Sequence, residues 1–173
     1  MPALIGFGCP DSHIHFYIAN RPPIDDYPQM QELRGLASGE IAHIVKNTSN
    51  HWRKVFNVYA KLLFDWQALI PHKSQRFVHH ENWQSLRDET LFQENSHASL
   101  LFNRPDVDRK SNAIRIIAGK TYAASLDLPA LEWLDNFFAI NKEYRLIVSP
   151  YPDYRQLSNA RIAQLITLMQ SMD

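Results

Sequence analysis

The feature that most constrains the fold is an alternation along the chain between short apolar segments and amphipathic helical stretches. Segments that are short, apolar and rich in β-branched and aromatic residues are typical of buried strands. Strands that alternate with helices predict an α/β fold. We therefore expect a three-layer sandwich around a central, largely parallel sheet of four to five strands. The candidate strands are residues 3–8, 13–20, 98–103, 113–119 and 144–149.

Two helices are indicated by apolar residues that recur every three or four positions, which places them on one helix face. In the longer helix, Ser49 or Asn50 can cap the start, and its apolar face consists of Trp52, Val55, Phe56, Tyr59, Leu63 and Trp66. The final helix has an apolar face of Ile162, Leu165, Ile166, Met169 and Met172. Shorter helices are expected over residues 38–47, 81–92, 120–126 and 128–140. In the last of these, Pro129 stands near the start, where its missing donor costs nothing.

Length and composition favour a single domain. The 173 residues are 45% hydrophobic, which is enough for one compact core. We find no internal repeat and no linker, so residues 1–173 are predicted to form one α/β domain. The 18 basic residues balance the 18 acidic residues, which weakens the case for a nucleic-acid partner but leaves room for a local basic patch.

The sequence also predicts where the protein is located. Cys9 is the one cysteine, so an intrachain disulfide is impossible, as expected in a reducing compartment. The first residues lack the basic and long apolar regions of a signal peptide. No apolar run approaches the roughly 20 residues that span a bilayer. We expect a soluble cytoplasmic protein without a membrane partner.

Two short patterns invite functional interpretations that their surroundings do not support. The segment AGKT at 118–121 resembles a phosphate-binding loop, but that loop needs a glycine where Ile114 stands. A strand-to-helix turn at Gly119 is the simpler interpretation. His13 and His15 would share one face of a strand, but no further ligands follow at a metal-site spacing. We predict no metal and no cofactor.

The segment LIVSPYPDYRQLSNARIAQLI at 146–166 carries the strongest functional signal. Ser158 can cap the final helix, and the free backbone donors of a helix start bind anions. Arg155 and Arg161 flank this start, although the helix dipole favours acidic residues there. These cations indicate that an anion binds. The alternative, that Asp153 pairs with Arg155 and the arginines are solvated, stays open.

The loop within this segment has a composition suited to holding a ligand. Pro150 and Pro152 stiffen it, which reduces the entropy lost on binding. Ligands of α/β proteins bind beyond the carboxyl ends of parallel strands. We expect residues 149–155 and residues 8–12 both to lie at that edge.

Three segments together resemble the uracil-DNA glycosylase superfamily, and most of all its mismatch-specific uracil/thymine branch. They are NHWRKVFNVYAKLL at 50–63, IRIIAGKTYAASL at 114–126 and the segment at 146–166. LIGFGCPDS at 4–12 stands where the family has its first motif. This chain departs from the family at two points. No acid or amide precedes Pro10, with Asp11 following it instead, and Ser149 precedes Pro150 without a serine after it.

The resemblance implies a base flipped into a pocket between the first and last loops. Asp11 would position or activate water, and Phe7 or Phe16 would stack on the base. Arg155 and the helix start at Ser158 would hold phosphates. Ser149, Tyr151 and Arg161 complete the candidate binding set.

These observations leave three alternative functions. The first is a DNA glycosylase, with DNA or a nucleobase as partner. The second is a non-catalytic binding module of the same fold, which the neutral charge and altered first motif favour over the first. The third is an unrelated α/β enzyme acting on a small phosphorylated molecule.

Overall fold

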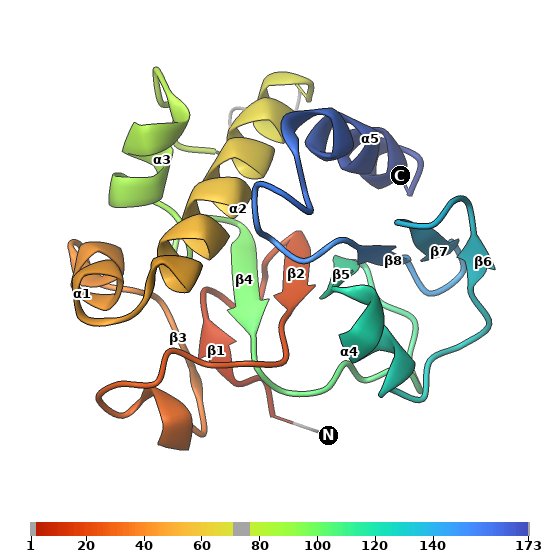
Figure 1. Ribbon diagram of the computed structural model, residues 1–173, viewed down its shortest axis with the longest axis horizontal. Coiled ribbons are helices and arrows are strands. Elements are labelled where there is room, and N and C mark those ends of the chain that lie inside the picture. The colour runs from red at the N-terminus through yellow and green to blue at the C-terminus, as the bar shows by residue number, and fades with distance from the viewer. Residues whose placement is uncertain (1–2, 71–76, 173) are drawn as a thin grey trace.

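The computed structural model describes residues 3–70 and 77–172, and it has the predicted α/β class (Figure 1). The helices are α1 (Glu40–Asn47), α2 (Asn50–Ala68), α3 (Trp83–Glu89), α4 (Lys120–Ala124) and α5 (Asn159–Gln170), with a 3₁₀ turn, η1 (Tyr27–Gln29). The strands are β1 (Gly6–Phe7), β2 (Ile14–Tyr17), β3 (Leu33–Arg34), β4 (Ala98–Leu101), β5 (Ile114–Ala118), β6 (Glu132–Trp133), β7 (Ala139–Asn141) and β8 (Leu146–Ser149).

The strands form one mixed sheet of eight in the order β3-β1-β4-β2-β5-β8-β7-β6. The neighbours β4, β2, β5 and β8 run parallel to one another. On one side β1 is antiparallel to β4, and on the other β7 is antiparallel to β8 and β6 to β7. The sheet is thus larger and more mixed than the predicted four to five strands, because three strands of two or three residues, β3, β6 and β7, extend its edges.

The two faces of the sheet are covered unequally. Side chains alternate along a strand, so in β2 Ile14 and Phe16 belong to a large core while Tyr17 belongs to a smaller one. The large core includes buried residues of α1, α2, α3 and α5. The smaller core includes α4 and parts of the connecting segments. Figure 1 shows α2 running between α3 and α5, and α2 contacts both of these helices.

Helix α2 confirms the predicted apolar periodicity. Ser49 occupies its N-cap position, and all six residues of the predicted face are buried. The Tyr59 ring stacks on Phe16 of β2 with centroids 4.0 Å apart. Each such side chain stabilises the fold by about 1.5–3 kcal/mol on burial.

The prediction of a helix over residues 128–140 is wrong. This segment forms β6, a turn and β7. Asp135 Oδ1 accepts hydrogen bonds from the backbone N–H groups of Phe137 at 2.7 Å and Phe138 at 2.8 Å. An aspartate that binds the backbone two residues later is a turn-former, and this turn sends Phe138 and Ile140 into the core. Proline near the start of the segment suggested a helix, but the turn formed by the Asp135 side chain breaks it into two strands.

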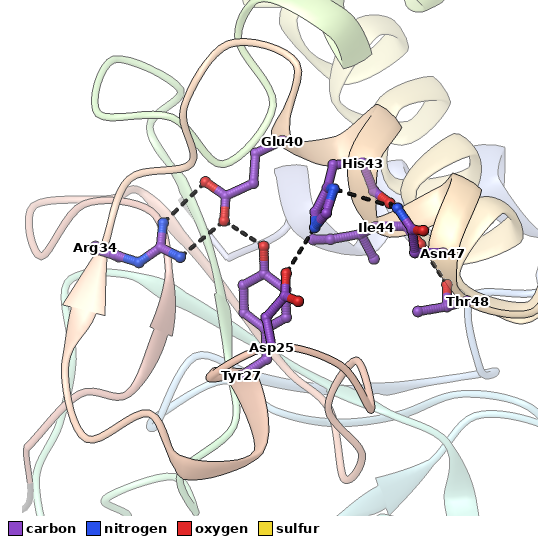
Figure 2. Close-up of polar contacts among 8 residues, drawn as sticks. All are labelled: Asp25, Tyr27, Arg34, Glu40, His43, Ile44, Asn47 and Thr48. Carbon is purple, nitrogen blue, oxygen red and sulfur yellow. Dashed lines mark hydrogen bonds and ion pairs between the residues drawn. The ribbon is translucent and has the colours of Figure 1, made fainter.

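The long connection between β2 and α1 is fixed by a polar cluster at Glu40 (Figure 2). Arg34 donates two hydrogen bonds to its carboxylate, at 2.9 and 2.8 Å, and Tyr27 donates a third at 2.5 Å. Burial alone would raise the pKa of Glu40, but the hydrogen bonds from Arg34, the Ala37 N–H and Tyr27 outweigh it and lower the pKa to about 2. The same connection is held to α1 by His43 Nε2, 2.7 Å from Asp25 Oδ2.

Candidate functional site

A cavity of about 660 Å³ opens where three parallel strands end. Ala19 lies just beyond β2, Ala118 ends β5, and Tyr151 follows β8, and all three line the cavity. Open α/β sheets bind ligands beyond the carboxyl ends of their strands, and cavities of 300–1,000 Å³ are typical of small-molecule sites. Position and size therefore make this cavity the leading candidate site.

The cavity is lined by three cationic side chains: Lys120, Arg155 and Arg161. The lining residues within the described ranges include neither aspartate nor glutamate. Cations in a concave surface raise the local concentration of anions. The remaining polar groups are hydroxyls and amides suited to hydrogen bonding: Thr121, Tyr122, Ser125, Asn136, Tyr151 and Gln156.

Arg161 is held in place by an aromatic ring and a carbonyl. Its guanidinium carbon lies 3.6 Å from the centre of the Phe137 ring, and its Nη1 donates to the Gln156 carbonyl at 2.7 Å. That bond uses one of the five N–H donors of a guanidinium. The turn made by Asp135 sets the position of Phe137, so the segment misassigned as a helix supplies one wall of the cavity.

The loop after β8 bears on the alternative pairing of Asp153 with Arg155. Asp153 Oδ1 accepts the backbone N–H of Arg155 at 2.8 Å, and its Oδ2 lies 3.7 Å from Lys54 Nζ. The carboxylate thus contacts the main chain of Arg155 and the side chain of Lys54. The Arg155 side chain is exposed and belongs to the cavity lining.

Tyr151 is fixed by a hydrogen-bonded chain that links three parts of the protein. Its hydroxyl donates to Asn20 Oδ1 at 2.9 Å and lies 2.5 Å from His51 Nε2. The His51 ring stacks on the tyrosine ring, with centroids 5.4 Å apart and 17° between planes. Burial raises the pKa of Tyr151 to about 12; the Asn20 hydrogen bond opposes this and Asp153 adds to it. The phenol therefore stays protonated at neutral pH.

The same surroundings favour the neutral form of His51. Burial lowers its pKa; Asp153 acts against this shift and Lys54 adds to it. Neither His51 nor Asn20 was predicted from the sequence, because the contacts span about 100 and 131 positions of chain. A histidine in the first turn of a helix gives no signal by itself.

Gly119 forms the turn from β5 into α4, as predicted. Its φ of 98° and ψ of 142° form a conformation that is essentially restricted to glycine. Its N–H donates to the Ser149 carbonyl at 2.9 Å. A Cβ at this position would lie 3.8 Å from the Tyr151 ring, which is an ordinary contact. Glycine is needed here for its conformation more than for space.

The structure brings three of the predicted site residues together: Tyr151, Arg155 and Arg161 all line the cavity. Ser149 is fully buried beneath them, and its hydroxyl donates to the Pro150 carbonyl at 3.0 Å. Ser158 occupies the N-cap position of α5 and is not among the described lining residues.

Phe7 and Phe16 are fully buried, so neither ring is available for stacking on a ligand. Phe7 packs edge-on against Tyr27 and Phe102, with centroids 5.4 and 5.1 Å away. Both rings are core residues, which corrects the stacking role that the resemblance implied.

Residues 8–12 lie at the opposite edge of the sheet from the cavity, which corrects the predicted placement. Because β1 runs antiparallel to β4, it ends near the start of β4, where Cys9 N donates to Ser99 Oγ at 3.1 Å. Asp11 is exposed beside this turn. A strand advances about 3.3 Å per residue, so the four residues of β2 hold its two ends roughly 10–13 Å apart. Asp11 and the cations of the cavity therefore do not share a site.

The fold and cavity define the class as an α/β protein with a cationic cavity at the carboxyl edge of its sheet. Residues 5–170 match the DUF6942 family, a family of unknown function, and the chain belongs to that family. Neither curated proteins nor solved structures gave a match.

Over residues 3–70 and 77–172, no helix is both long and apolar enough to cross a bilayer. In the same part of the chain, no three histidine, cysteine, aspartate or glutamate side chains gather as a metal site would require.

Proposed function

We propose that this protein binds a small phosphorylated molecule in the cavity at the carboxyl edge of the sheet. The observation that carries the proposal is that Lys120, Arg155 and Arg161 line this cavity while its described lining contains no carboxylate. Arginine side chains hold phosphate oxygens through paired, charge-assisted hydrogen bonds. The rigid Tyr151 and the stacked Arg161 are consistent with a preformed site, which loses little entropy on binding.

A second candidate is nucleic-acid binding, with or without base excision, as the resemblance to uracil-DNA glycosylases suggests. Tyr154 favours it, because its ring is 48% exposed beside the cavity loop and Lys54 Nζ lies 4.9 Å from its centre. Exposed aromatic rings next to cations are typical of surfaces that bind single strands. The distance of Asp11 from the cavity weighs against the catalytic form of this candidate.

The proposal is tested by titrating the protein with ribose 5-phosphate in a calorimeter. A hydrogen bond to a charged group contributes about 1.5–3 kcal/mol, so Arg155→Gln and Arg161→Gln should each weaken binding about 10- to 100-fold. Arg109→Gln is the matched control, because this arginine is exposed outside the cavity lining, and it should leave the affinity unchanged. Equal affinity in the wild type and the Arg155→Gln/Arg161→Gln double variant would refute the proposal.

Salt dependence separates the two candidates. Binding of an oligonucleotide that contacts several phosphates weakens steeply with salt, whereas a single small anion gives a shallow slope. A base-excision assay on uracil-containing and mismatched oligonucleotides tests the catalytic form. Abasic product that is lost in Asp11→Asn would favour a glycosylase over the binding function proposed here.

A further inference from the structure

A second cavity, of about 410 Å³, adjoins the first. The two share Lys120 and Asn136 in their linings. The rest of the second lining consists of Ala123, Ala124, Leu131, Trp133 and Asp135. Together the cavities offer a binding surface that has a cationic part and a part with an aromatic ring, and Lys120 belongs to both.

Trp133 is the distinctive residue of this second cavity. It lies on the edge strand β6 and is 43% exposed. Phe137, which lines the first cavity, is 40% exposed. Exposed apolar surface beside a cavity is typical of binding sites. The partly exposed indole is therefore available for contact with a ligand.

Lys120 connects the aromatic ring to the anion site. Its Nζ lies 4.8 Å from the centre of the Trp133 ring, a cation–π contact that is weak at exposed sites. A contact this weak is readily exchanged for a phosphate oxygen. Lys120 lines both cavities. When the ring of a ligand stacks on Trp133, the Lys120 ammonium can therefore leave the indole and turn into the first cavity.

The acidic residue of the second cavity is already engaged. Asp135 Oδ1 accepts the two backbone hydrogen bonds of the β6–β7 turn, and its Oδ2 accepts one from Gln164 at 2.8 Å. The hydrogen bond from Gln164, together with those from the backbone, lowers the pKa of Asp135. This carboxylate holds the turn and is not free for a ligand. Asn136, which lines both cavities, is therefore the neutral polar side chain that can hydrogen-bond to a ligand there.

We propose that the ligand is a phosphorylated compound with a flat heteroaromatic ring, of the nucleoside monophosphate class. Its phosphate binds Lys120, Arg155 and Arg161 in the first cavity, and its ring stacks on Trp133 in the second. A flat ring suits this cavity better than an alkyl chain does, because a ring can stack on the indole that Trp133 supplies. The inference rests on the proposed function and adds the chemical class of the ligand.

The test compares three probes by calorimetry: adenosine 5′-monophosphate, ribose 5-phosphate and adenosine. Stacking on an aromatic side chain should make the nucleotide bind about tenfold more tightly than ribose 5-phosphate. In Trp133→Leu this preference should disappear, while the affinity for ribose 5-phosphate stays within about twofold. Lys120→Met should weaken both phosphate-bearing probes and leave adenosine unaffected.

Trp83→Leu is the matched control. Trp83 also carries a lysine over its ring, with Lys61 Nζ at 5.0 Å, but it lies on α3 away from both cavities. This variant should keep the preference for the nucleotide. Trp133→Phe, which retains a ring, should lose only part of the preference, and this guards against an effect of lost stability.

The outcomes separate the two proposals. If neither phosphate-bearing probe binds, the proposed function fails. If ribose 5-phosphate binds as tightly as the nucleotide, and Trp133→Leu changes neither, the anion site stands and the ring subsite is refuted.

Discussion

The loops at the two edges of the central sheet have similar compositions, but their polar groups lie in different surroundings. The turn at residues 8–12 and the loop after β8 both combine proline with acidic and hydroxyl residues. At the amino edge the polar groups satisfy one another: Ser12 and Ser99 both donate to the Cys9 carbonyl, at 2.6 and 2.8 Å. At the carboxyl edge Lys120, Arg155 and Arg161 face a cavity instead.

The comparison teaches that loop composition does not distinguish a binding loop from a closed turn. The decisive property is whether the polar groups find partners inside the protein. Around Cys9 they do, so the turn closes on β4. Along the cavity Lys120 and Arg161 are held by ring faces and one carbonyl, contacts that leave guanidinium and ammonium donors for a ligand.

The largest expected difference between the edges comes from adding one methyl group at a glycine. At Gly8, with φ of 130°, a Cβ would lie 2.7 Å from the Ala98 carbonyl oxygen, a backbone atom that cannot move aside cheaply. Strain and overpacking together should lower the free energy of unfolding of Gly8→Ala by about 3–5 kcal/mol. At Gly119 an added Cβ makes only ordinary contacts with the Tyr151 side chain, so strain alone should cost Gly119→Ala about 1–3 kcal/mol.

Urea denaturation of both variants measures this difference. Gly8→Ala should retain wild-type affinity for ribose 5-phosphate wherever it remains folded, because it lies at the far edge. Gly119→Ala should weaken that affinity, since it displaces the turn that carries Lys120. An equal loss of stability in the two variants would show that the backbone at Gly8 is no more tightly packed than the backbone at Gly119.

How much of the fold could be predicted from the sequence depends on how far apart in the chain the interacting residues are. The apolar face of α2 is local, so its six residues were predicted correctly. The three short strands at the sheet edges depend on distant pairing, such as Ile140 of β7 with Ile147 of β8, and were missed. The placement of Asp11 failed for the same reason, because the direction of β1 is decided by β4, more than 90 positions away.

The candidate site was predicted in part. Tyr151, Arg155 and Arg161 lie in one segment, and the charge of the two arginines near a helix start gave a signal. Lys120 and Phe137 reach the cavity from other segments through the topology of the sheet. The stacking of His51 on Tyr151 likewise requires a packed structure, since nothing in the local sequence pairs them.

A second closed polar cluster, at Glu40, should respond to pH. The pKa of Glu40 lies near 2, below its ordinary value of 4.5, so its stabilisation is full above pH 4.5 and is lost as the pH falls toward 2. Because Arg34 is 42% exposed, solvent screening reduces the effect, and Glu40→Gln should lower the free energy of unfolding by about 1–2 kcal/mol at pH 7.

Urea denaturation at pH 7 and pH 3 checks the sign, because the gap between wild type and Glu40→Gln should narrow at the lower pH. The control is Glu143→Gln, whose pair with Lys110 is 3.0 Å long but 63–67% exposed. It should change stability by less than about 0.5 kcal/mol at either pH. A gap that widens on acidification would mean that the cluster does not depend on the ionised carboxylate.

The smallest effect is expected at the carboxyl edge, from Tyr151→Phe. The variant keeps the ring but removes the hydroxyl that joins Asn20 and His51. The loss of a partly buried hydrogen bond should lower the free energy of unfolding by about 1 kcal/mol. The affinity for ribose 5-phosphate should fall about threefold at most, because the hydroxyl positions the ring and the cations bind the anion. Tyr154→Phe, in the same loop but 48% exposed, should change neither quantity. If Tyr151→Phe instead abolished binding while the protein stayed fully stable, the hydroxyl itself would be a ligand group, and the cavity would read hydroxyl or carbonyl groups as well as charge.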